Sequence, residues 1–385
     1  MKILCIFSLL FTFLVSPKRL NAIEDTSIDL GIEAPSAILI EESSGKVLYK
    51  KNENEKLYPA SMTKMMGMLL ILDDIQSGKH TFDEIVTTSS TASNMGGSQI
   101  FLEVGEQMSV DDMFKAVCIN SANDAITALA EHFGGSLQNF IKRMNSKAKD
   151  IGMKNTSFMN VTGFYDPNHY TTAYDMSLLA KELLNKHKEI LLPYTSMFEA
   201  YIREDSSSPF WLVTTNKLIK YYDGMDGLKT GFINESKYCL TATALRDGMR
   251  LISVVMKSDS VEKRSKDTTT LMNYGFANYK RVELFKKGEV ITTHTFKNAK
   301  TNNSPIISNS SISIIVTKDF NIDNIKLTYT CLKKYAPVKS KEKVGELTVH
   351  SQNNEMFTYD LISLNKIEDK SFGYKLIEYW KEILS

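Results

Sequence analysis

The 385-residue sequence lacks the features that mark several common classes of protein. Its formal net charge is +1, and it contains no basic tract with interleaved aromatic residues, so nucleic acid is not an expected partner. It has no glycine-rich phosphate loop and no HExxH pair. Its six histidines are scattered, without ligand spacing to a cysteine or a carboxylate, so we expect neither a metal site nor a cofactor.

Cysteine is also scarce. The chain has four cysteines, and Cys5 lies in an apolar leader, which leaves Cys118, Cys239 and Cys331. Three cysteines cannot build a disulfide framework, so the protein has to rely on a hydrophobic core, which a chain of this length can bury. We expect Cys118 and Cys239 to be buried as small hydrophobic residues.

Long apolar runs are absent except at the N-terminus. A charged start is followed by thirteen apolar or small residues, and a small-residue exit comes at Ala22. The run is too short to span a bilayer comfortably, which favours a secretory signal over residues 1–22 and predicts an exported protein. The alternative is that this segment is not cleaved and serves as a membrane anchor, because Lys18 and Arg19 lie close to the proposed cleavage point.

The expected elements run from strands through helices and back to strands. Residues 34–52 read as a hairpin, and a mostly apolar helix follows Ser61. Residues 85–190 have a largely helical pattern, and strand-like segments return between residues 238 and 257. We therefore expect residues 23–283 to form an α+β domain, in which one sheet takes strands from both ends and a helical cluster lies alongside.

The composition changes from about residue 284. Serine, asparagine and threonine become frequent and short β-rich runs recur, which predicts a small all-β domain over residues 284–370. Residues 371–385 place four apolar residues on one helical face: Phe372, Leu376, Trp380 and Leu384. A helix this short cannot span a bilayer, so we expect an amphipathic helix at a membrane surface. Packing against the β-rich domain is the alternative.

Ser61 and Lys64 could form a nucleophile and its base. They lie three residues apart at the head of the apolar helix, where both would share a face. A serine hydroxyl is a weak nucleophile without such a base, and a buried lysine beside another cation can lose its proton near neutral pH. The chain contains six Ser-x-x-Lys quartets, so a helix cap is an equally simple interpretation of this one alone.

Two further motifs decide between these interpretations. Ser121 and Asn123 open a later helix, where either could serve only as an N-cap. Lys229, Thr230 and Gly231 form a triplet that occurs once, just before a predicted strand. The lysine can attract a carboxylate, the threonine can hydrogen-bond it, and the glycine lets a substrate backbone lie against the strand edge.

Ser-x-x-Lys, Ser-x-Asn and Lys-Thr-Gly in this order are the signature of serine penicillin-recognising enzymes. The chain resembles the D-alanyl-D-alanine carboxypeptidases, which are low-molecular-mass penicillin-binding proteins. PASMTK, SANDA, TGFYDPNHYTTAYDM, DGLKTGF and APVKSKEKVGELTV carry the resemblance, which extends from about residue 25 to 372. It implies a penicillin-recognising α/β (α+β) fold, an antiparallel sheet with helices on both sides, followed by a β-rich second domain.

The resemblance also implies the reaction and the location. The substrate is a peptidoglycan stem peptide ending in D-Ala-D-Ala, from which the terminal D-alanine is removed through an acyl-enzyme, and β-lactams are covalent inhibitors. The enzyme is expected at the outer face of the bacterial cytoplasmic membrane or in the cell wall. Carried over residue by residue, Ser61 is the acylated nucleophile and Lys64 is its general base. Ser121 relays a proton to the leaving amine, and Asn123 positions the substrate.

Substrate recognition is implied for the third motif. Lys229 and Thr230 hold the terminal carboxylate, next to Gly231. The oxyanion lies between the backbone amides of Ser61 and Phe232, and amides aimed in this way are worth about 3–4 kcal/mol of barrier each. The following text departs from the family, because Lys237 replaces a small residue beside the cleft strand and leaves the fine substrate preference open.

Three other functions compete. A class A β-lactamase needs a glutamate some way after the Ser-x-Asn motif, and no glutamate occurs between Glu131 and Glu182. A penicillin sensor carries several membrane spans, whereas the leader is the only long apolar run here. An endopeptidase acting on cross-links within the same fold stays open. For His169, in the long loop before the last helix of the middle section, we expect a structural role.

Overall fold

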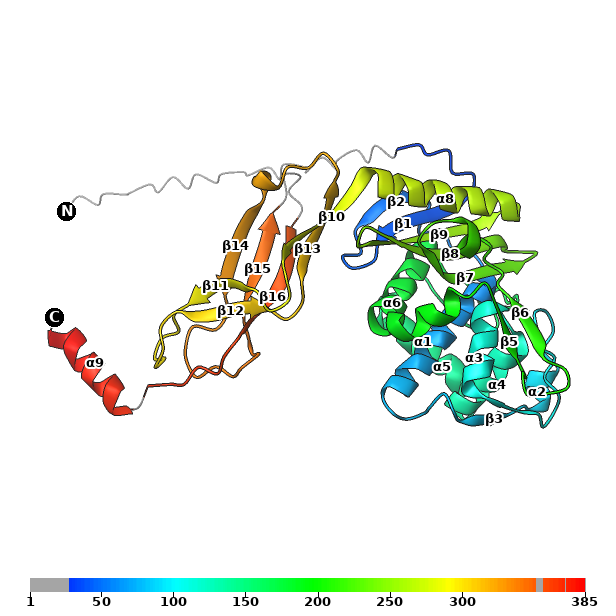
Figure 1. Ribbon diagram of the computed structural model, residues 1–385, viewed down its shortest axis with the longest axis horizontal. Helices are drawn as coiled ribbons and strands as arrows, with labels where there is room; N and C mark the ends of the chain where they lie inside the picture. Colours follow the sequence, from blue (N-terminus) through cyan, green and yellow to red (C-terminus); the bar gives the residue numbers. More distant parts are fainter. Residues whose placement is uncertain (1–27, 351–355, 371, 385) are drawn as a thin grey trace, which may run out of the picture.

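The computed structural model describes residues 28–350, 356–370 and 372–384. The expected signal segment, residues 1–22, lies outside the described residues. Within the part of the chain that is described, no helix has both the length and the apolarity to cross a bilayer. Figure 1 shows an α+β part, a β-rich part beside it and a C-terminal helix that stands apart from both.

A five-stranded antiparallel sheet with the order β2-β1-β9-β8-β7 forms the centre of the α+β part. Its strands are β1 (Ser36–Glu41), β2 (Val47–Lys51), β7 (Met225–Ile233), β8 (Lys237–Arg246) and β9 (Met249–Ser258). Ser36 of β1 pairs with Met256 of β9, so the sheet joins the two ends of this part. The predicted sheet with strands from both ends is confirmed.

Helices cover both faces of this sheet, as expected (Figure 1). One face carries α8 (Val261–Asn278), which packs on β8 and β9. The other face carries α6 (Ala173–Thr195) and a helical cluster, of which η1 contacts β7 and β8 directly. That cluster consists of η1 (Ala60–Thr63), α1 (Lys64–Gln76), α2 (Ser90–Ser93), α3 (Val110–Ile119), α4 (Asn123–Gly134) and α5 (Leu137–Asp150).

The first helix of the cluster is central because it is apolar on nearly every side. All residues from Lys64 to Leu72 are buried, and α1 contacts α4, α5 and α6. Short elements at the margin complete this part: β3 (Ile85–Thr87) pairs with β4 (Gln107–Ser109), β5 (Glu199–Ile202) pairs with β6 (Phe210–Val213), and α7 (Leu218–Tyr221) precedes β7. The burial around α1 fixes its first turn in place, and this matters for the site below.

The β-rich part begins where α8 ends, at Tyr279. A ribbon of β10 (Tyr279–Phe285) and β13 (Ile312–Thr317) leads into a second sheet with the order β11-β12-β16-β15-β14. The remaining elements are β11 (Val290–His294), β12 (Ser304–Ser308), η2 (Ile322–Asn324), β14 (Lys326–Cys331), β15 (Lys343–His350) and β16 (Met356–Ser363). Alternating buried residues such as Ile312, Ile314 and Val316 fill its core. The expected all-β region is confirmed.

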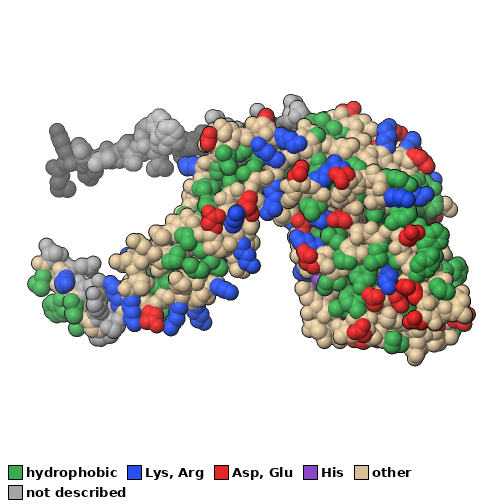
Figure 2. Space-filling model, viewed as in Figure 1, with side chains coloured by type: hydrophobic (Ala, Val, Ile, Leu, Met, Phe, Trp, Pro, Cys, Tyr) green, Lys and Arg blue, Asp and Glu red, His purple; other side chains and the backbone are tan. Residues whose placement is uncertain are grey.

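The C-terminal helix α9 (Phe372–Leu384) exposes apolar side chains (Figure 2). Leu376 is 48% exposed, Trp380 is 55% exposed and Leu384 is 82% exposed. Ile377 and Ile383, which the sequence analysis did not include in the stripe, are exposed as well. These five positions recur with helical spacing, so the apolar face is wider than one residue per turn. Their exposure argues against the alternative in which this helix packs against the β-rich part.

Candidate active site

Three segments far apart in the sequence meet at the first turn of α1. Ser61 lies in η1 and Lys64 is the first residue of α1. Ser121 lies just before α4, and Asn123 is the first residue of that helix. The edge strand β7 runs directly beside η1 and carries Lys229 in its centre. The structure thus brings the three motifs together in one place.

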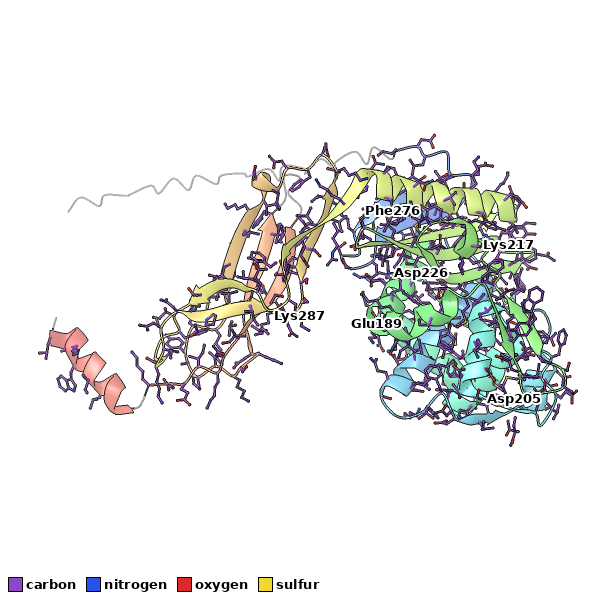
Figure 3. All side chains as sticks on the ribbon, in the orientation of Figure 1. Glu189, Asp205, Lys217, Asp226, Phe276 and Lys287 are labelled. Atoms are coloured by element: carbon purple, nitrogen blue, oxygen red, sulfur yellow. The ribbon has the colours of Figure 1, made fainter. Side chains whose placement is uncertain are left out.

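A buried polar contact holds the edge strand in place. Asp226 of β7, labelled in Figure 3, pairs with Arg250 of β9 through an Nη1–Oδ1 contact of 2.7 Å. The same guanidinium donates to Thr243 Oγ1 of β8 at 3.0 Å. Thr195, the last residue of α6, donates its hydroxyl to the backbone oxygen of Asp226 at 2.7 Å. These contacts attach β7 to the sheet and to α6, so the backbone at Lys229 is held in a fixed position.

The hydroxyl of Ser61 does not cap a helix. Among the described residues no side chain caps η1, and Ser61 Oγ accepts a hydrogen bond from Lys64 Nζ at 2.9 Å. Ser260, which begins another Ser-x-x-Lys quartet, does cap its helix, because its Oγ accepts from the backbone N–H of Lys263 at 3.2 Å. Ala60 is held at φ +47°, a left-handed conformation that alanine rarely adopts. The local backbone therefore directs Ser61 to the lysine.

The amine of Lys64 is suited to act as a base. It is fully buried and also donates to the backbone oxygen of Thr162 at 3.0 Å. Burial lowers the pKa of Lys64 well below its usual value, the charge of Lys229 lowers it further, and Asp124 opposes the shift. A lone pair on Nζ is therefore available at a pH where an exposed lysine would be fully protonated.

The Ser121 and Asn123 side chains contribute polar atoms that are buried without a partner. Asn123 Nδ2 donates to the backbone oxygen of Gly96 at 2.7 Å, which fixes the orientation of the amide. Asn123 Oδ1 and Ser121 Oγ have no hydrogen-bond partner among the described residues, although both atoms are buried. Buried polar atoms are almost always hydrogen-bonded, so these two atoms are groups that a substrate can engage.

The Lys229 side chain is an almost fully buried cation. Its Nζ donates to the backbone oxygen of Thr230 at 3.1 Å, and burial lowers the pKa of Lys229 to about 7. The charge on Lys229 also lowers the pKa of Lys64. Thr230 Oγ1 lies 2.6 Å from Thr215 Oγ1, which orients the threonine hydroxyl. A cation and a hydroxyl so placed suit a carboxylate.

Two glycines allow neighbouring backbone segments to approach the segment before Ser61 closely. A Cβ added at Gly231 would lie 2.7 Å from the backbone oxygen of Pro59. Gly163 has φ +88°, and a Cβ there would come within 1.8 Å of the backbone oxygen of Ala60. We expected Gly231 to make room for a substrate backbone; in the structure it makes room for η1.

Phe232 and Lys237 lie at the outer end of the same strand. The Phe232 ring is exposed and packs against the Tyr238 ring at a centroid distance of 4.4 Å. Lys237 is exposed where β7 turns into β8, opposite Ile233, with φ +52°. The residue that departs from the family pattern therefore lies at the turn, beyond the buried Lys229 and Thr230.

The site geometry and the fold agree with one family. A family model described as D-alanyl-D-alanine carboxypeptidase matches residues 23–260, and a model of the penicillin-binding protein 5 C-terminal domain matches residues 279–369. This chain belongs to the D-alanyl-D-alanine carboxypeptidase family. It is a serine peptidase of the D-Ala-D-Ala carboxypeptidase type, and the predicted family, fold class and enzyme class are confirmed.

Individual relatives give the same result. The chain is 43% identical over 322 residues to D-alanyl-D-alanine carboxypeptidase DacF of Bacillus subtilis, covering 83% of this chain and 82% of that protein. Penicillin-binding protein 5 of Haemophilus influenzae matches in structure with a TM-score of 0.77 and 28% identity, over 88% of this chain and 98% of that one. Penicillin-binding protein D2 of Listeria monocytogenes, solved in an ampicillin-bound form, matches with a TM-score of 0.58 and 32% identity, over 64% of this chain and 99% of that one.

Several residues of this carboxypeptidase site did not stand out in the sequence. Asp124 is buried beside the site and accepts the backbone N–H groups of Ile100 and Leu102 at 3.0 and 3.1 Å. Thr162 offers a backbone oxygen to Lys64, a role that any residue type could fill. Thr215 gave no signal either, because its contact to Thr230 depends on two segments meeting in space. Asp124 lies inside SANDA and Thr162 begins TGFYDPNHYTTAYDM, but neither residue was singled out within its motif.

His169 has the structural role that we expected. The backbone N–H of Met159 donates to His169 Nδ1 at 3.2 Å, so the ring proton is on Nε2, which donates to Thr63 Oγ1 at 2.8 Å. Burial lowers the pKa of His169 to about 4, so the ring is neutral at physiological pH. The imidazole thus fastens the long loop to the last residue of η1.

The environments of the cysteines and of two histidines can also be compared with the predictions. Cys118 and Cys239 are buried, as expected, and burial raises the pKa of the Cys239 thiol to about 11.

The interpretation that the histidines are scattered without ligand spacing is wrong for one pair. The fold brings His80 and His132 together on Glu84, with ligand atoms within 4.8 Å of one another. The chain positions of these residues did not reveal this, because His132 follows on a separate helix.

Proposed function

We propose that this enzyme removes the terminal D-alanine from peptidoglycan stem peptides ending in D-Ala-D-Ala, with Ser61 as the acylated nucleophile. The observation that carries the proposal is the 2.9 Å contact between Lys64 Nζ and Ser61 Oγ, made by a fully buried lysine. A neutral Lys64 accepts the Ser61 proton as Oγ attacks the carbonyl carbon of the penultimate residue.

Charge that develops on the attacked oxygen is stabilised by two backbone amides, those of Ser61 and Phe232. Ser121 Oγ passes its proton to the departing amine and takes in exchange the proton that Lys64 accepted, and free D-alanine leaves. Water then attacks the ester on Ser61, and the again neutral Lys64 takes a proton from this water and returns it to Ser61 Oγ as the ester breaks. Each step uses a group that is either buried beside the nucleophile or on the edge of β7, where aimed dipoles act without solvent reorganisation.

Recognition of the substrate end is assigned to Lys229 and Thr230. The terminal carboxylate binds the buried ammonium and the hydroxyl that Thr215 orients. Asn123 receives the peptide backbone through its amide, since Oδ1 is buried without another partner among the described residues. Lys237, at the exposed turn, affects only the part of the substrate that extends past the end of β7.

Location and domain assignment belong to the same proposal. Residues 1–22 act as a signal peptide, residues 23–283 as the catalytic domain and residues 284–370 as the second domain. The enzyme then works at the outer face of the bacterial cytoplasmic membrane or in the cell wall, where its substrate is found. β-lactams acylate the same serine and inhibit the enzyme, which makes it a penicillin-binding protein.

Mass spectrometry after incubation with benzylpenicillin tests the proposal. We expect one adduct per chain, on the peptide that contains Ser61, and an adduct that persists, because no glutamate lies between Glu131 and Glu182 to activate a water. In parallel, D-alanine release is measured from a pentapeptide and from cross-linked wall. Rapid turnover of penicillin would favour the β-lactamase alternative, and preferential cleavage of cross-links would favour the endopeptidase.

Lys229→Gln should weaken recognition of a free carboxylate. Losing a charge-assisted hydrogen bond costs about 1.5–3 kcal/mol, so kcat/KM should fall about tenfold to hundredfold more on a D-Ala-D-Ala peptide than on its C-terminal amide. Lys237→Gln, which removes an exposed lysine of the next turn, is the matched control and should change both substrates little. Equal losses on both substrates in the Lys229 variant would show that this lysine serves the chemistry alone.

The pKa of Lys229 gives the same recognition step a pH dependence. Because the pKa of Lys229 is about 7 and the charged form binds the carboxylate, kcat/KM for the free-carboxylate peptide should decline as the pH rises through about 7. The amide substrate should lack this decline. A profile with the same alkaline limb for both substrates would contradict the assignment of Lys229.

We also propose that α9 holds the enzyme at a membrane surface as an in-plane helix. Deleting residues 371–385 should lower liposome co-sedimentation at least tenfold, since burial of one large apolar side chain is worth about 1.5–3 kcal/mol. Trp380→Glu should show a large part of this loss, whereas Lys381→Gln on the same helix should not. If the truncated chain sediments as well as the intact one, the helix has another task.

A further inference from the structure

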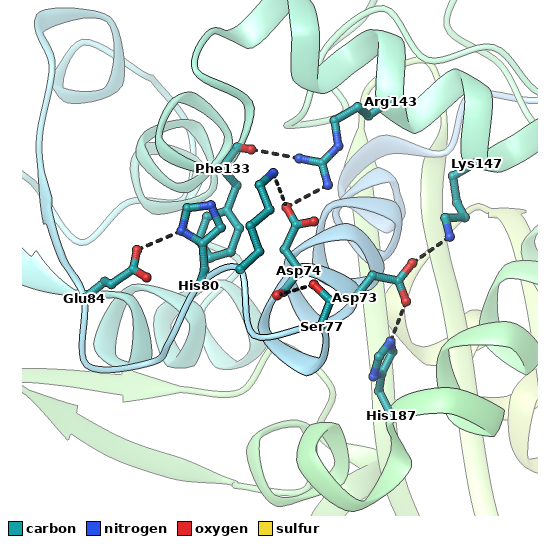
Figure 4. Close-up of polar contacts among 10 residues, drawn as sticks. Asp73, Asp74, Ser77, His80, Glu84, Phe133, Arg143, Lys147 and His187 are labelled. Carbon is teal, nitrogen blue, oxygen red and sulfur yellow. Dashed lines mark hydrogen bonds and ion pairs between the residues drawn. The ribbon is translucent and has the colours of Figure 1, made fainter.

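A cluster of His80, Glu84 and His132 lies at the far end of the helix that begins at the active site. His80 follows the end of α1, Glu84 precedes β3, and His132 is in the last turn of α4. Figure 4 shows His80 and Glu84 facing each other beside the end of α1. No step of the proposed reaction uses these residues.

The three side chains converge on one point. His80 Nδ1 and His132 Nε2 each lie 2.8 Å from the same oxygen of Glu84, Oε2. All three ligand atoms lie within 4.8 Å of one another. In a tetrahedral zinc site with bonds of about 2.0–2.2 Å, ligand atoms are about 3.3 Å apart. To reach this geometry the two nitrogen-to-oxygen distances lengthen by about 0.5 Å, and the distance between the two imidazole nitrogens changes by up to about 1.5 Å.

Surrounding contacts fix these side chains in the orientation that coordination needs. The other oxygen of Glu84, Oε1, accepts the backbone N–H of Thr81 at 2.9 Å. The ring of His80 packs on Phe133 at a centroid distance of 4.4 Å, and the ring of His132 packs on the same phenyl group at 5.5 Å. Outer contacts of this kind orient metal ligands and raise affinity. The ligand side chains are 17–32% exposed, so an ion can reach them from solvent.

Neighbouring cations do not oppose a metal ion at this point, because they are paired elsewhere. Asp74 at the end of α1 contacts Arg143 Nη2 at 2.7 Å and Lys79 Nζ at 3.5 Å, and Figure 4 shows Arg143 turned towards Asp74. The carboxylate of Glu84 is thus the negative group that faces the two imidazoles. Two imidazoles and one carboxylate form a ligand set that zinc uses, with further positions left for water.

We propose that His80, Glu84 and His132 bind one Zn²⁺ ion. Binding displaces the proton from each ligating nitrogen, and each histidine then binds as a neutral imidazole that carries its proton on the other ring nitrogen. The site joins the C-terminal end of α4 to the segment after α1, and the opposite ends of these two helices carry Asn123 and Lys64. Because α1 is about 20 Å long, the ion is too distant to take part in the reaction and acts by holding the two helices together.

Isothermal titration of the metal-free protein with zinc chloride tests this inference. We expect one Zn²⁺ per chain, with affinity lowered at least thirtyfold in both His132→Gln and Glu84→Gln. The control variant is His350→Gln, which removes a half-buried histidine of the β-rich part and should bind zinc as the unaltered protein does. Zinc should raise the melting temperature of the unaltered protein and of the control, but not of the two ligand variants.

A second measurement separates this cluster from another possible zinc ligand pair. Cys331 Sγ lies 3.3 Å from His294 Nε2, so cobalt(II) substitution is read for a thiolate charge-transfer band, which a site without cysteine lacks. Penicillin labelling at the normal rate establishes that each variant is folded. Binding that survives in both ligand variants, or that is lost in Cys331→Ser, would overturn the proposal.

Discussion

Ser61→Ala is expected to abolish both D-alanine release and penicillin labelling while the protein stays folded. The alanine keeps the half-buried position in η1 filled but removes the only oxygen that accepts from Lys64 Nζ within that turn. In serine hydrolases, loss of the nucleophile lowers kcat on the order of 10⁶-fold, because the remaining groups act only through it. Labelled penicillin on a denaturing gel and D-alanine release measure the two losses.

Ser260→Ala is the matched control for this experiment. Ser260 begins the same Ser-x-x-Lys quartet, but its hydroxyl caps α8 through the Lys263 backbone N–H. Removing a cap costs about 1 kcal/mol, so this variant should melt at a lower temperature and still be labelled. Stoichiometric labelling of the Ser61 variant would disprove its role as nucleophile, whatever the stability of either protein.

Lys64→Arg should cost about 10²–10⁴-fold in the rate of acylation, which is the usual contribution of a general base. Arginine stays protonated in proteins and cannot accept the Ser61 proton. A buried guanidinium could also unfold the protein, so Lys64→Met, which keeps the apolar stem, is tested beside it. Both variants should be inactive, and the methionine variant should keep its fold.

The pH dependence of acylation gives an independent check on the same residue. The neutral form of Lys64 is the active one, so the rate should rise with pH as the amine loses its proton. Because burial and the charge of Lys229 lower the pKa of Lys64, the midpoint should lie well below 10.5. A methionine variant that is still acylated, or an unaltered enzyme whose rate rises only near pH 10.5, would point to a different base.

The sequence predicted the elements of the site better than the way they fit together. Ser61, Lys64 and the solid apolar helix behind them follow from a local pattern, and the two later motifs follow from spacing and residue type. The sheet of the α+β part was predictable because its strand-like segments lie at both ends of that part. The order of the segments along the chain and the period of their hydrophobic residues are enough to predict such helices and strands.

Contacts between separate segments could not be predicted in the same way. Three contacts depend on two separate segments meeting in space: those made by the backbone oxygen of Thr162, by the hydroxyl of Thr215 and between His132 and Glu84. A main-chain oxygen has no residue-type signature. Gly231 shows the same limit, because a glycine indicates a close approach without saying which segment approaches, and here the segment is η1.

The pairing of Ser36 with Met256 joins the first strand of the α+β part to one of its last, so the central sheet is complete only when both have been synthesised. A growing chain has no neighbour for β1 on its β9 side until residues 249–258 are available, and without that sheet β7 has no support beside η1. Contacts of such long sequence separation form late, because a long loop must close before they can. The nucleophile is therefore made early but is unable to react until nearly the whole α+β part has been made, so an unfinished chain cannot hydrolyse its substrate.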